Sequence, residues 1–237
     1  MKPSNLITSP QEDVIPALDN LFKYRKEIYP GQIFETYLMA CWPGCDIAGH
    51  VPNLIQYGQK VQHITEMGVR FGWSTRSFLI AQPKTLTSID LGPWQSTHVH
   101  GGGNEHFSPP CHHLENPQYE KYRNLYSSIT DFKYIIGDTT QLQPIEETEL
   151  LFIDTKHDKN TLEQELKIHG NRSIKYIIFH DTNSFGNFGE GHDPNSTTSV
   201  GTGLWYAIIP WLQENKHWFI KEHFDHTCGL TILERRS

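Results

Sequence analysis

The sequence predicts an α/β fold with a doubly wound, mostly parallel sheet of seven strands, and three observations support this. From about residue 61 onward, short apolar runs alternate with stretches of helical periodicity, which is the pattern of βαβ units. The last two apolar runs have no helix between them and predict an antiparallel C-terminal hairpin. Two long loops, 92–119 and 183–203, follow the carboxyl ends of strands, where open α/β sheets bind ligands.

Residues 1–60 predict an N-terminal helical extension. A helix is expected over 17–28, where apolar residues recur near helical spacing, and Pro30 with Gly31 is expected to end it. A second helix is expected over 51–60. The rest of the chain, 61–237, is expected to form the sheet domain.

The elements of the sheet domain follow in order. Strands are expected over 61–66, 85–90, 132–136, 150–154, 176–180, 218–224 and 230–234. Helices are expected over 74–81, 159–169 and 204–213. Leu162 and Leu166 lie four residues apart and so share one face of the second of these helices. A turn at Cys228 and Gly229 separates the final two strands.

Composition restricts the class of protein. The 237 residues include 37% hydrophobic and 12% aromatic residues, enough for a sizeable core. A net charge of −7 disfavours nucleic-acid binding, which needs Lys and Arg. No apolar run approaches the ~20 residues of a transmembrane helix, and residues 1–13 lack a signal-peptide pattern. We therefore expect a cytoplasmic protein with no nucleic-acid or membrane partner. Four cysteines are too few for a disulfide framework at this length.

A glycine-containing turn follows the first expected strand. Glu66, Gly68 and Gly72 have the spacing E-x-G-x-x-x-G, and Ser74 stands where a helix begins. Glycine permits a tight turn and close approach of a ligand, and a helix N-terminus offers unpaired N–H groups. Asp90 ends the next strand, where an acid commonly binds ribose hydroxyls. The set predicts an adenosine-type cofactor without a pyrophosphate; the alternative is an ordinary turn that needs glycine.

This turn resembles motif I of class I S-adenosylmethionine-dependent methyltransferases. The resemblance covers about residues 46–235. It implies that Gly68 and Gly72 flank the methionine part of the cofactor, that Asp90 binds its ribose, and that Glu66 lies beside its amine.

The segment after the third expected strand adds to the resemblance. Residues 136–139 resemble the segment that lines the adenine and ribose side in such enzymes, which implies that Asp138 and Thr139 bind the cofactor together with Ser74. The family has a Rossmann-like fold whose last strand is inserted antiparallel, as the C-terminal hairpin would allow.

A cluster of potential metal ligands is expected at the carboxyl edge of the sheet. Asp154 ends the fourth strand, and His180 and Asp181 end the fifth, so adjacent parallel strands bring them together. Carboxylates suit Mg²⁺, and an imidazole suits Mn²⁺, Fe²⁺ or Zn²⁺ better. The alternative is that these acids are helix caps or turn residues that bind no metal.

The cluster is similar to that of metal-dependent sugar and natural-product O-methyltransferases, including the cephalosporin-hydroxylase-like group. They carry an Asp after strand four and an acidic or Asp–Asn pair after strand five. Here the pair is His180 and Asp181, a departure that leaves open whether His180 binds metal or hydrogen-bonds within the sheet. His157 follows Asp154 in the D-x-x-H spacing of these enzymes, which implies that His157 is the base; the alternative is a surface histidine.

Two other segments carry polar residues with the potential to bind ligands. The histidine-rich stretch 97–113 is expected to be a substrate-covering lid, with a structural zinc site or a solvated loop as alternatives. The glycine-rich stretch 185–192 is expected to form another substrate wall. Cys41 and Cys45 are interpreted as flanking a turn, with His50 nearby as a metal-ligating alternative.

Together these residues predict an S-adenosylmethionine-dependent O-methyltransferase with a divalent metal such as Mg²⁺ or Mn²⁺. Its acceptor would be a hydroxyl of a small molecule or glycan, and the aromatic N-terminal helices could form a homo-oligomer interface. One alternative is a metal-dependent hydrolase or oxygenase that uses Asp154, His157, His180 and Asp181. Another is a non-catalytic cofactor-binding module.

Overall fold

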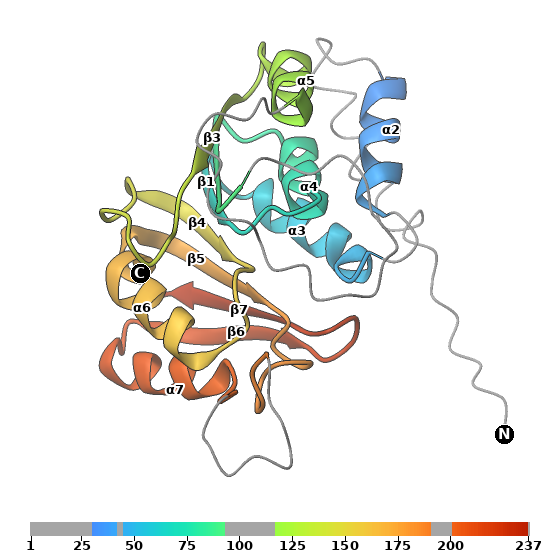
Figure 1. Cartoon of the computed structure of the whole chain (residues 1–237). Helices are drawn as coiled ribbons and strands as arrows, with labels where there is room; N and C mark the ends of the chain where they lie inside the picture. The colour runs from blue at the N-terminus through green and yellow to red at the C-terminus, as the bar shows by residue number, and fades with distance from the viewer. Residues whose placement is uncertain (1–29, 42–44, 93–116, 191–200, 237) are drawn as a thin grey trace, which may run out of the picture.

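The computed structural model describes residues 30–41, 45–92, 117–190 and 201–236 (Figure 1). The expected helix 17–28 and the histidine-rich stretch 97–113 lie outside the described residues, as does 191–200 of the second long loop.

A seven-stranded sheet forms the centre of the molecule, with the order β3-β2-β1-β4-β5-β7-β6. Strands β1 to β5 are parallel to one another, and β7 is antiparallel to both β5 and β6. This confirms the mostly parallel sheet and its antiparallel C-terminal hairpin. The strands are β1 (His63–Met67), β2 (Thr85–Asp90), β3 (Asp131–Ile136), β4 (Thr148–Ile153), β5 (Ser173–His180), β6 (Trp218–Phe224) and β7 (Leu230–Arg235).

Helices cover both faces of the sheet (Figure 1). On one face lie α2 (Pro30–Ala40), η1 (Ala48–His50), α3 (Val51–Gly58), α4 (Trp73–Ala81) and α5 (Pro117–Tyr126); on the other lie α6 (Lys159–His169), η2 (Gly170–Arg172) and α7 (Trp205–Glu214). Side chains alternate along each strand, so Leu150 and Phe152 of β4 join the first core, and Leu151 and Ile153 join the second. Apolar runs buried on both faces are typical of parallel strands.

Two helices were not expected. Pro30 is the first residue of α2, a position where proline is common in helices. Helix α5 starts at Pro117, so it takes over the last residues of the loop expected over 92–119. Tyr122 and Tyr126 of α5 are buried, and Tyr119 and Leu125 are partly buried against the same core. Three of these four inward-facing residues are tyrosines, whose helix propensity is modest, so the sequence signal for this helix is weak.

The N-terminal helices pack against the sheet domain. Ile33 and Tyr37 of α2 and Leu54 of α3 belong to the same buried core as Phe78 of α4. The described part of residues 1–60 therefore shares a hydrophobic core with the sheet.

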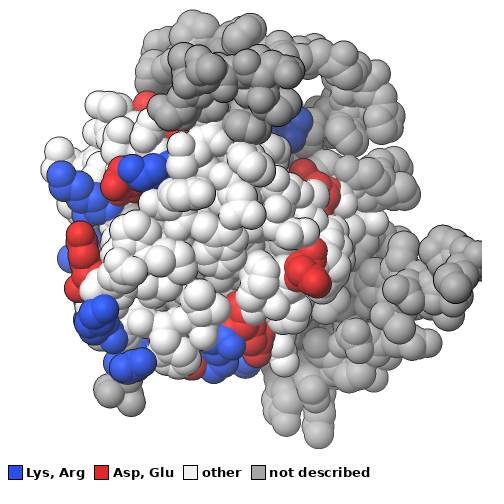
Figure 2. Space-filling view, turned by 90° about the horizontal axis from the view of Figure 1, so that it is seen from below, with Lys and Arg blue, Asp and Glu red and all other residues white. Residues whose placement is uncertain are grey.

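Among the described residues, charges of both signs occur on the face that carries α7. In the view from below, Lys and Arg side chains lie among Asp and Glu around an uncharged area (Figure 2). Helix α7 exposes Tyr206 and Ile209 on its outer side. Among the described residues, none of the helices has the length and apolar character that a membrane span requires.

Candidate active site

The loop of residues 67–72, called the glycine loop below, connects β1 to α4 at the carboxyl edge of the sheet. Gly68 has a φ of 86° and Gly72 a φ of 70°, and Gly72 is the N-cap of α4. These left-handed conformations favour glycine. A Cβ atom at Gly68 would overlap the backbone carbonyl group of Asp154. The glycine loop therefore lies directly against the end of β4.

Asp90, at the end of β2, holds the glycine loop in place. Its Oδ2 atom accepts hydrogen bonds from the backbone N–H groups of Val69 (2.7 Å) and Arg70 (2.9 Å). Its Oδ1 atom accepts one from Gly92 at 3.1 Å. A carboxylate offers about four acceptor positions, so roughly one remains for a ligand hydroxyl.

Glu66 lies beneath the glycine loop and is fully buried. Its Oε2 atom accepts hydrogen bonds from the hydroxyls of Thr75 and Ser88, while Oε1 has no hydrogen-bond partner. Burial raises the pKa of Glu66 to about 7, although hydrogen bonds from Ser74, Ser88 and Thr75 oppose this. Buried Ser74 thus contacts Glu66 at the start of α4.

Arg76 of α4 also supports the glycine loop. Its guanidinium is buried and donates to the carbonyl oxygens of Phe71 (2.7 Å) and Gly72 (3.1 Å), and to the hydroxyl of Tyr122 on α5 (2.9 Å). We did not identify Arg76 from the sequence, because arginine in a helix is usually solvated. The available signal was that Arg76 is the sole charged residue of α4.

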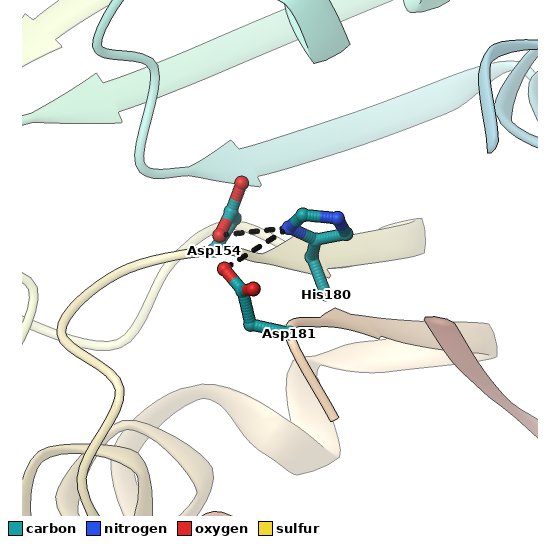
Figure 3. Close-up of side chains that lie close together, drawn as sticks. All are labelled: Asp154, His180 and Asp181. Carbon is teal, nitrogen blue, oxygen red and sulfur yellow. Dashed lines mark ion pairs between the residues drawn. The ribbon is translucent and has the colours of Figure 1, made fainter. Parts of the chain in front are cut away.

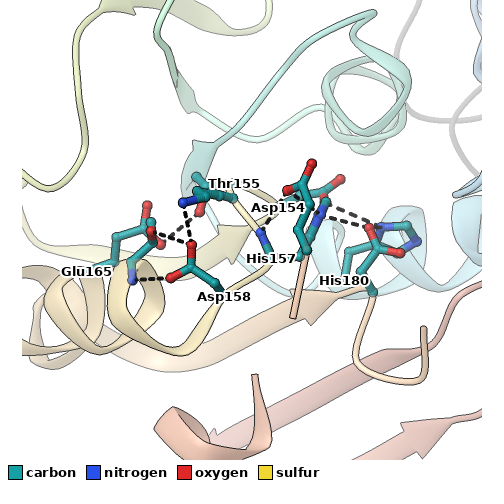
Figure 4. A network of polar contacts seen from close by, with 10 residues as sticks. Asp154, Thr155, His157, Asp158, Glu165 and His180 are labelled. Atoms are coloured by element: carbon teal, nitrogen blue, oxygen red, sulfur yellow. Dashed lines mark hydrogen bonds and ion pairs between the residues drawn. The ribbon is translucent and has the colours of Figure 1, made fainter. Parts of the chain in front are cut away.

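The two residues expected after β3 differ in their orientation. Asp138 is exposed, and its Oδ1 accepts from the N–H and hydroxyl of Thr140. Thr139 is buried, and its hydroxyl donates instead to Glu165 of α6 at 2.5 Å. Glu165 also accepts from Thr155 at 2.8 Å (Figure 4). Thr139 therefore anchors the loop to α6, while Asp138 remains open to solvent.

Four residues, called the carboxylate–histidine cluster below, meet at the ends of β4 and β5: Asp154, His157, His180 and Asp181. One ligand atom each from Asp154, His180 and Asp181 lies within 4.8 Å of the others (Figure 3). The Nδ1 atom of His180 is 3.4 Å from Asp154 Oδ1 and 3.2 Å from Asp181 Oδ2. Asp181 has a φ of 59°, an uncommon backbone conformation that is often found at functional sites.

His157 contacts both acids of the cluster, and its place beside Asp154 is visible in Figure 4. Its Nε2 atom lies 2.9 Å from Asp181 Oδ2 and 3.3 Å from Asp154 Oδ1, and its Nδ1 lies 3.5 Å from Glu190 Oε2. Its ring stacks on Phe185, with centroids 4.7 Å apart and planes 6° apart. His157 is therefore held in one orientation by the loops after β4 and β5.

Electrostatics favour ion pairs within the cluster. Burial lowers the pKa of His157, but hydrogen bonds to Asp154, Asp181 and Glu190 outweigh it and raise this pKa to about 12. For His180 the carboxylates of Asp154 and Asp181 likewise outweigh burial and raise the pKa to about 11. The histidines in turn lower the pKa of Asp154 and of Asp181, against the effect of burial.

The cluster fits a divalent cation. Two carboxylates and an imidazole are a donor set that suits Mn²⁺, Fe²⁺ or Zn²⁺. The two acids supply negative charge, and His180 directs its Nδ1 atom at both of them through ion pairs alone, without a hydrogen bond of good geometry. A cation would displace the proton that the ion pairs keep on His180, because a metal-bound imidazole must be neutral.

The structure resembles those of several methyltransferases. It matches SAH-bound PaMTH1 of Podospora anserina with a TM-score of 0.51 and 13% identity over 99% of this chain and 100% of that one. It matches CalS11, a calicheamicin methyltransferase, with a TM-score of 0.51 and 12% identity, covering 97% and 94%. It matches the N-methyltransferase NodS of Bradyrhizobium japonicum WM9 with a TM-score of 0.50 and 13% identity, covering 82% and 99%.

No family model and no curated protein matches the sequence. These solved structures share only 12% to 13% sequence identity with this chain, so their similarity is evidence for its fold alone. The strand order, the antiparallel β7 and these likenesses lead to one conclusion. The chain has the Rossmann-like fold of the class I S-adenosylmethionine-dependent methyltransferases.

Proposed function

We propose that this protein is an S-adenosylmethionine-dependent methyltransferase that methylates a hydroxyl group of a small molecule or sugar, with a divalent cation at Asp154, His180 and Asp181. One observation carries the proposal. The backbone of Gly68 packs against the backbone of Asp154, so the expected cofactor loop lies beside the carboxylate–histidine cluster, as a shared site for donor and acceptor requires. Methyl donor and acceptor hydroxyl must meet within such a site, because group transfer needs the reacting atoms in contact.

The residues present suit the cofactor. Left-handed Gly68 and Gly72 let a ligand approach the backbone, and the N-terminus of α4 leaves N–H groups available. Asp90 retains acceptor capacity for a ribose hydroxyl, and Asp138 is exposed beside it, since the N–H of Gly137 bonds to the carbonyl of Asp90. The similar protein PaMTH1 is SAH-bound, which supports the same type of cofactor here.

The preference for oxygen over nitrogen rests on the cluster. A neutral amine is already nucleophilic, whereas a hydroxyl needs help to lose its proton. A bound divalent cation would supply Lewis acidity toward that hydroxyl. The hydroxyl oxygen would form a bond to the methyl carbon as the carbon–sulfur bond of the sulfonium breaks, and His157 would accept the hydroxyl proton.

His157 can accept a proton only in its neutral form. Asp154, Asp181 and Glu190 keep its pKa at about 12 in this state. If Asp154 and Asp181 are engaged by other positive charge, the pKa of His157 should fall toward the range where imidazole serves as a base. Asp154 and Asp181 would therefore also control the basicity of His157.

Calorimetric titration tests the cofactor. We expect S-adenosylmethionine and S-adenosylhomocysteine to bind with micromolar dissociation constants, and SAH to form when hydroxylated acceptors are added. If the folded protein binds neither compound, with or without EDTA, the methyltransferase proposal is wrong.

Asp90→Ala tests the cofactor contact. Loss of a carboxylate that bonds both the glycine loop and a ribose hydroxyl should weaken SAH binding about 10- to 100-fold, while Mn²⁺ binding persists. Asp131→Ala is the matched control, because Asp131 forms an exposed ion pair with Lys133 at the start of β3. Equal SAH affinity in both variants would refute the role of Asp90.

Asp154→Asn tests the cation. We expect this variant to lose Mn²⁺ binding and methyl transfer, since a neutral amide is a poorer ligand than a carboxylate. Its SAH affinity without added metal should differ only a few-fold from that of the metal-free wild type. Full activity of Asp154→Asn, or full activity of the wild type in EDTA, would exclude the metal from the reaction.

A further inference from the structure

His50 lies against the carboxylate–histidine cluster. It ends η1, and its side chain is fully buried. Its Nε2 atom lies 2.9 Å from the carbonyl oxygen of His226 and 3.1 Å from that of Thr227, on the turn between β6 and β7. Carbonyl oxygens only accept, so Nε2 must carry the ring hydrogen. The Nδ1 atom of a neutral ring is then an acceptor, and it is buried without a hydrogen-bond partner.

His180 also has a ring nitrogen that needs a hydrogen-bond partner. Its Nδ1 atom faces Asp154 and Asp181, and its other ring nitrogen points away from them (Figure 3). That second nitrogen, Nε2, is buried and has no hydrogen-bond partner. The rings of His50 and His180 meet edge to face, with centroids 5.9 Å apart and planes at 77°. The Nδ1 atom of His50, a buried acceptor, and the Nε2 atom of His180, a buried nitrogen that can carry a hydrogen, thus lie on neighbouring rings.

We propose that His50 is a positioning residue for the cation site, whose Nδ1 accepts a hydrogen bond from the Nε2–H of His180. This contact would fix the hydrogen of His180 on Nε2 and leave the Nδ1 lone pair toward Asp154 and Asp181. Histidines that bind metals usually donate their second N–H to such a partner. The inference rests on the cation site of the proposed function.

The surrounding backbone holds His50 in this position. Gly49 packs so closely on the β6–β7 turn that a Cβ atom there would overlap the hydroxyl of Thr227. The turn has three consecutive residues with positive φ, Thr227, Cys228 and Gly229. Its Cys228 carbonyl accepts from the N–H of Asn183, two residues after Asp181. The turn thus connects η1 to the end of β5, which carries His180.

Zinc titration of two His50 variants tests the inference. Calorimetry should show Zn²⁺ binding to the wild type that is lost in Asp154→Asn, which assigns it to the cluster. For that site, His50→Leu should weaken Zn²⁺ binding 10- to 100-fold and leave the SAH affinity of the metal-free protein within about twofold. His50→Gln should restore most of the Zn²⁺ affinity, because its amide can donate to the turn and accept from His180.

Two measurements distinguish a role of His50 in positioning His180 from a contribution of His50 to packing alone. In Zn²⁺-loaded protein with ¹⁵N-labelled histidine, NMR should place the hydrogen of His180 on Nε2 in the wild type and in His50→Gln, and show loss of this single tautomer in His50→Leu. Gly49→Ala disturbs the same contact with the turn but keeps the acceptor, so its His180 signals should match the wild type.

The failures are distinguishable. Wild-type protein that binds no Zn²⁺ at the cluster would overturn the cation site and the role of His50 together. Zn²⁺ binding that Asp154→Asn abolishes but His50→Leu leaves unchanged would overturn the role of His50 alone. Equal loss of the His180 tautomer in Gly49→Ala and His50→Leu would also overturn it.

Discussion

Single residues with left-handed backbone conformations lie on both sides of the candidate site. Gly68, Arg70 and Gly72 belong to the glycine loop, and Asp181 ends β5. A residue with a Cβ atom is destabilised in this region by roughly 1–2 kcal/mol, so the packing around Arg70 and Asp181 must hold them there. Strain of this kind often gathers where ligands bind.

Gly68→Ala should destabilise the fold by roughly 2 kcal/mol or more, because its φ is positive and its Cβ would overlap the carbonyl of Asp154. SAH binding should fall with it. Gly92→Ala is the matched control, since a Cβ there meets nothing within 4 Å. Urea unfolding compares the variants, and equal free energies of unfolding would contradict the close packing of the glycine loop.

Glu165 makes stability depend on pH. Burial raises its pKa from 4.5 to about 7, against hydrogen bonds from Thr139 and Thr155 that lower it. A carboxyl whose folded pKa exceeds its unfolded pKa contributes its full stabilisation below pH 4.5 and loses it as the pH rises through about 7. From pH 4.5 to 8, the wild type should therefore lose about 3 kcal/mol relative to Glu165→Gln.

Urea unfolding of both proteins at pH 4.5 and pH 8 measures this difference. Glu163→Gln controls for the substitution, because Glu163 is an exposed neighbour on α6 that pairs with Lys159. A difference between wild type and Glu165→Gln that stays constant with pH would show that Glu165 titrates normally.

The sequence located the cluster residues because they end strands. Asp154, His180 and Asp181 follow apolar runs directly, and parallel strands meet at one edge. The orientation of Thr139 toward Glu165 was not predictable, because a threonine after a strand gives no sign of the face it points to. His50 was predicted only as a weak alternative ligand, since its partner carbonyls lie 176 and 177 residues away.

At the scale of elements, Arg76 joins α4, α5 and the glycine loop. Arg76→Met should destabilise the protein by about 2–4 kcal/mol, because two loop carbonyls and Tyr122 lose a buried donor. SAH affinity should drop as the loop loosens. Arg123→Met, which breaks an exposed ion pair with Glu120 on α5, should change stability by under about 0.5 kcal/mol. Similar thermal unfolding midpoints for Arg76→Met and Arg123→Met would contradict the role of Arg76 in holding the glycine loop.

Elements were predictable where their apolar pattern was strong. Helix α6 has the expected bounds, Lys159–His169, because Leu162 and Leu166 define its inner face and Asp158 caps it. Helix α5 was missed because three of its four residues that face the core are tyrosines, whose helix propensity is modest. Helix α2 was missed because Pro30 fits a helix start as well as a stop.

At the scale of the whole molecule, the two proposed ligand sites should influence each other. The glycine loop contacts Asp154 through Gly68, and the N–H of Asp154 bonds to the carbonyl of Met67. Saturating Mn²⁺ should therefore tighten SAH binding by roughly 5- to 150-fold, and SAH should tighten Mn²⁺ binding equally. Calorimetry in both orders measures this, and independent affinities would show that the loop and β4 move separately.

The strand order has a consequence for the chain during its synthesis. Strand β7 lies between β5 and β6, so β5 has no neighbour on that side until residues 218–235 have left the ribosome. The His50 contact with His226 spans 176 residues and must form equally late. A nascent chain with β1 to β5 already folded would present an open strand edge, the feature that most readily recruits other chains into aggregates. Both the solubility of the growing protein and the completion of its candidate site thus depend on the same hairpin, which is synthesised after β1 to β5.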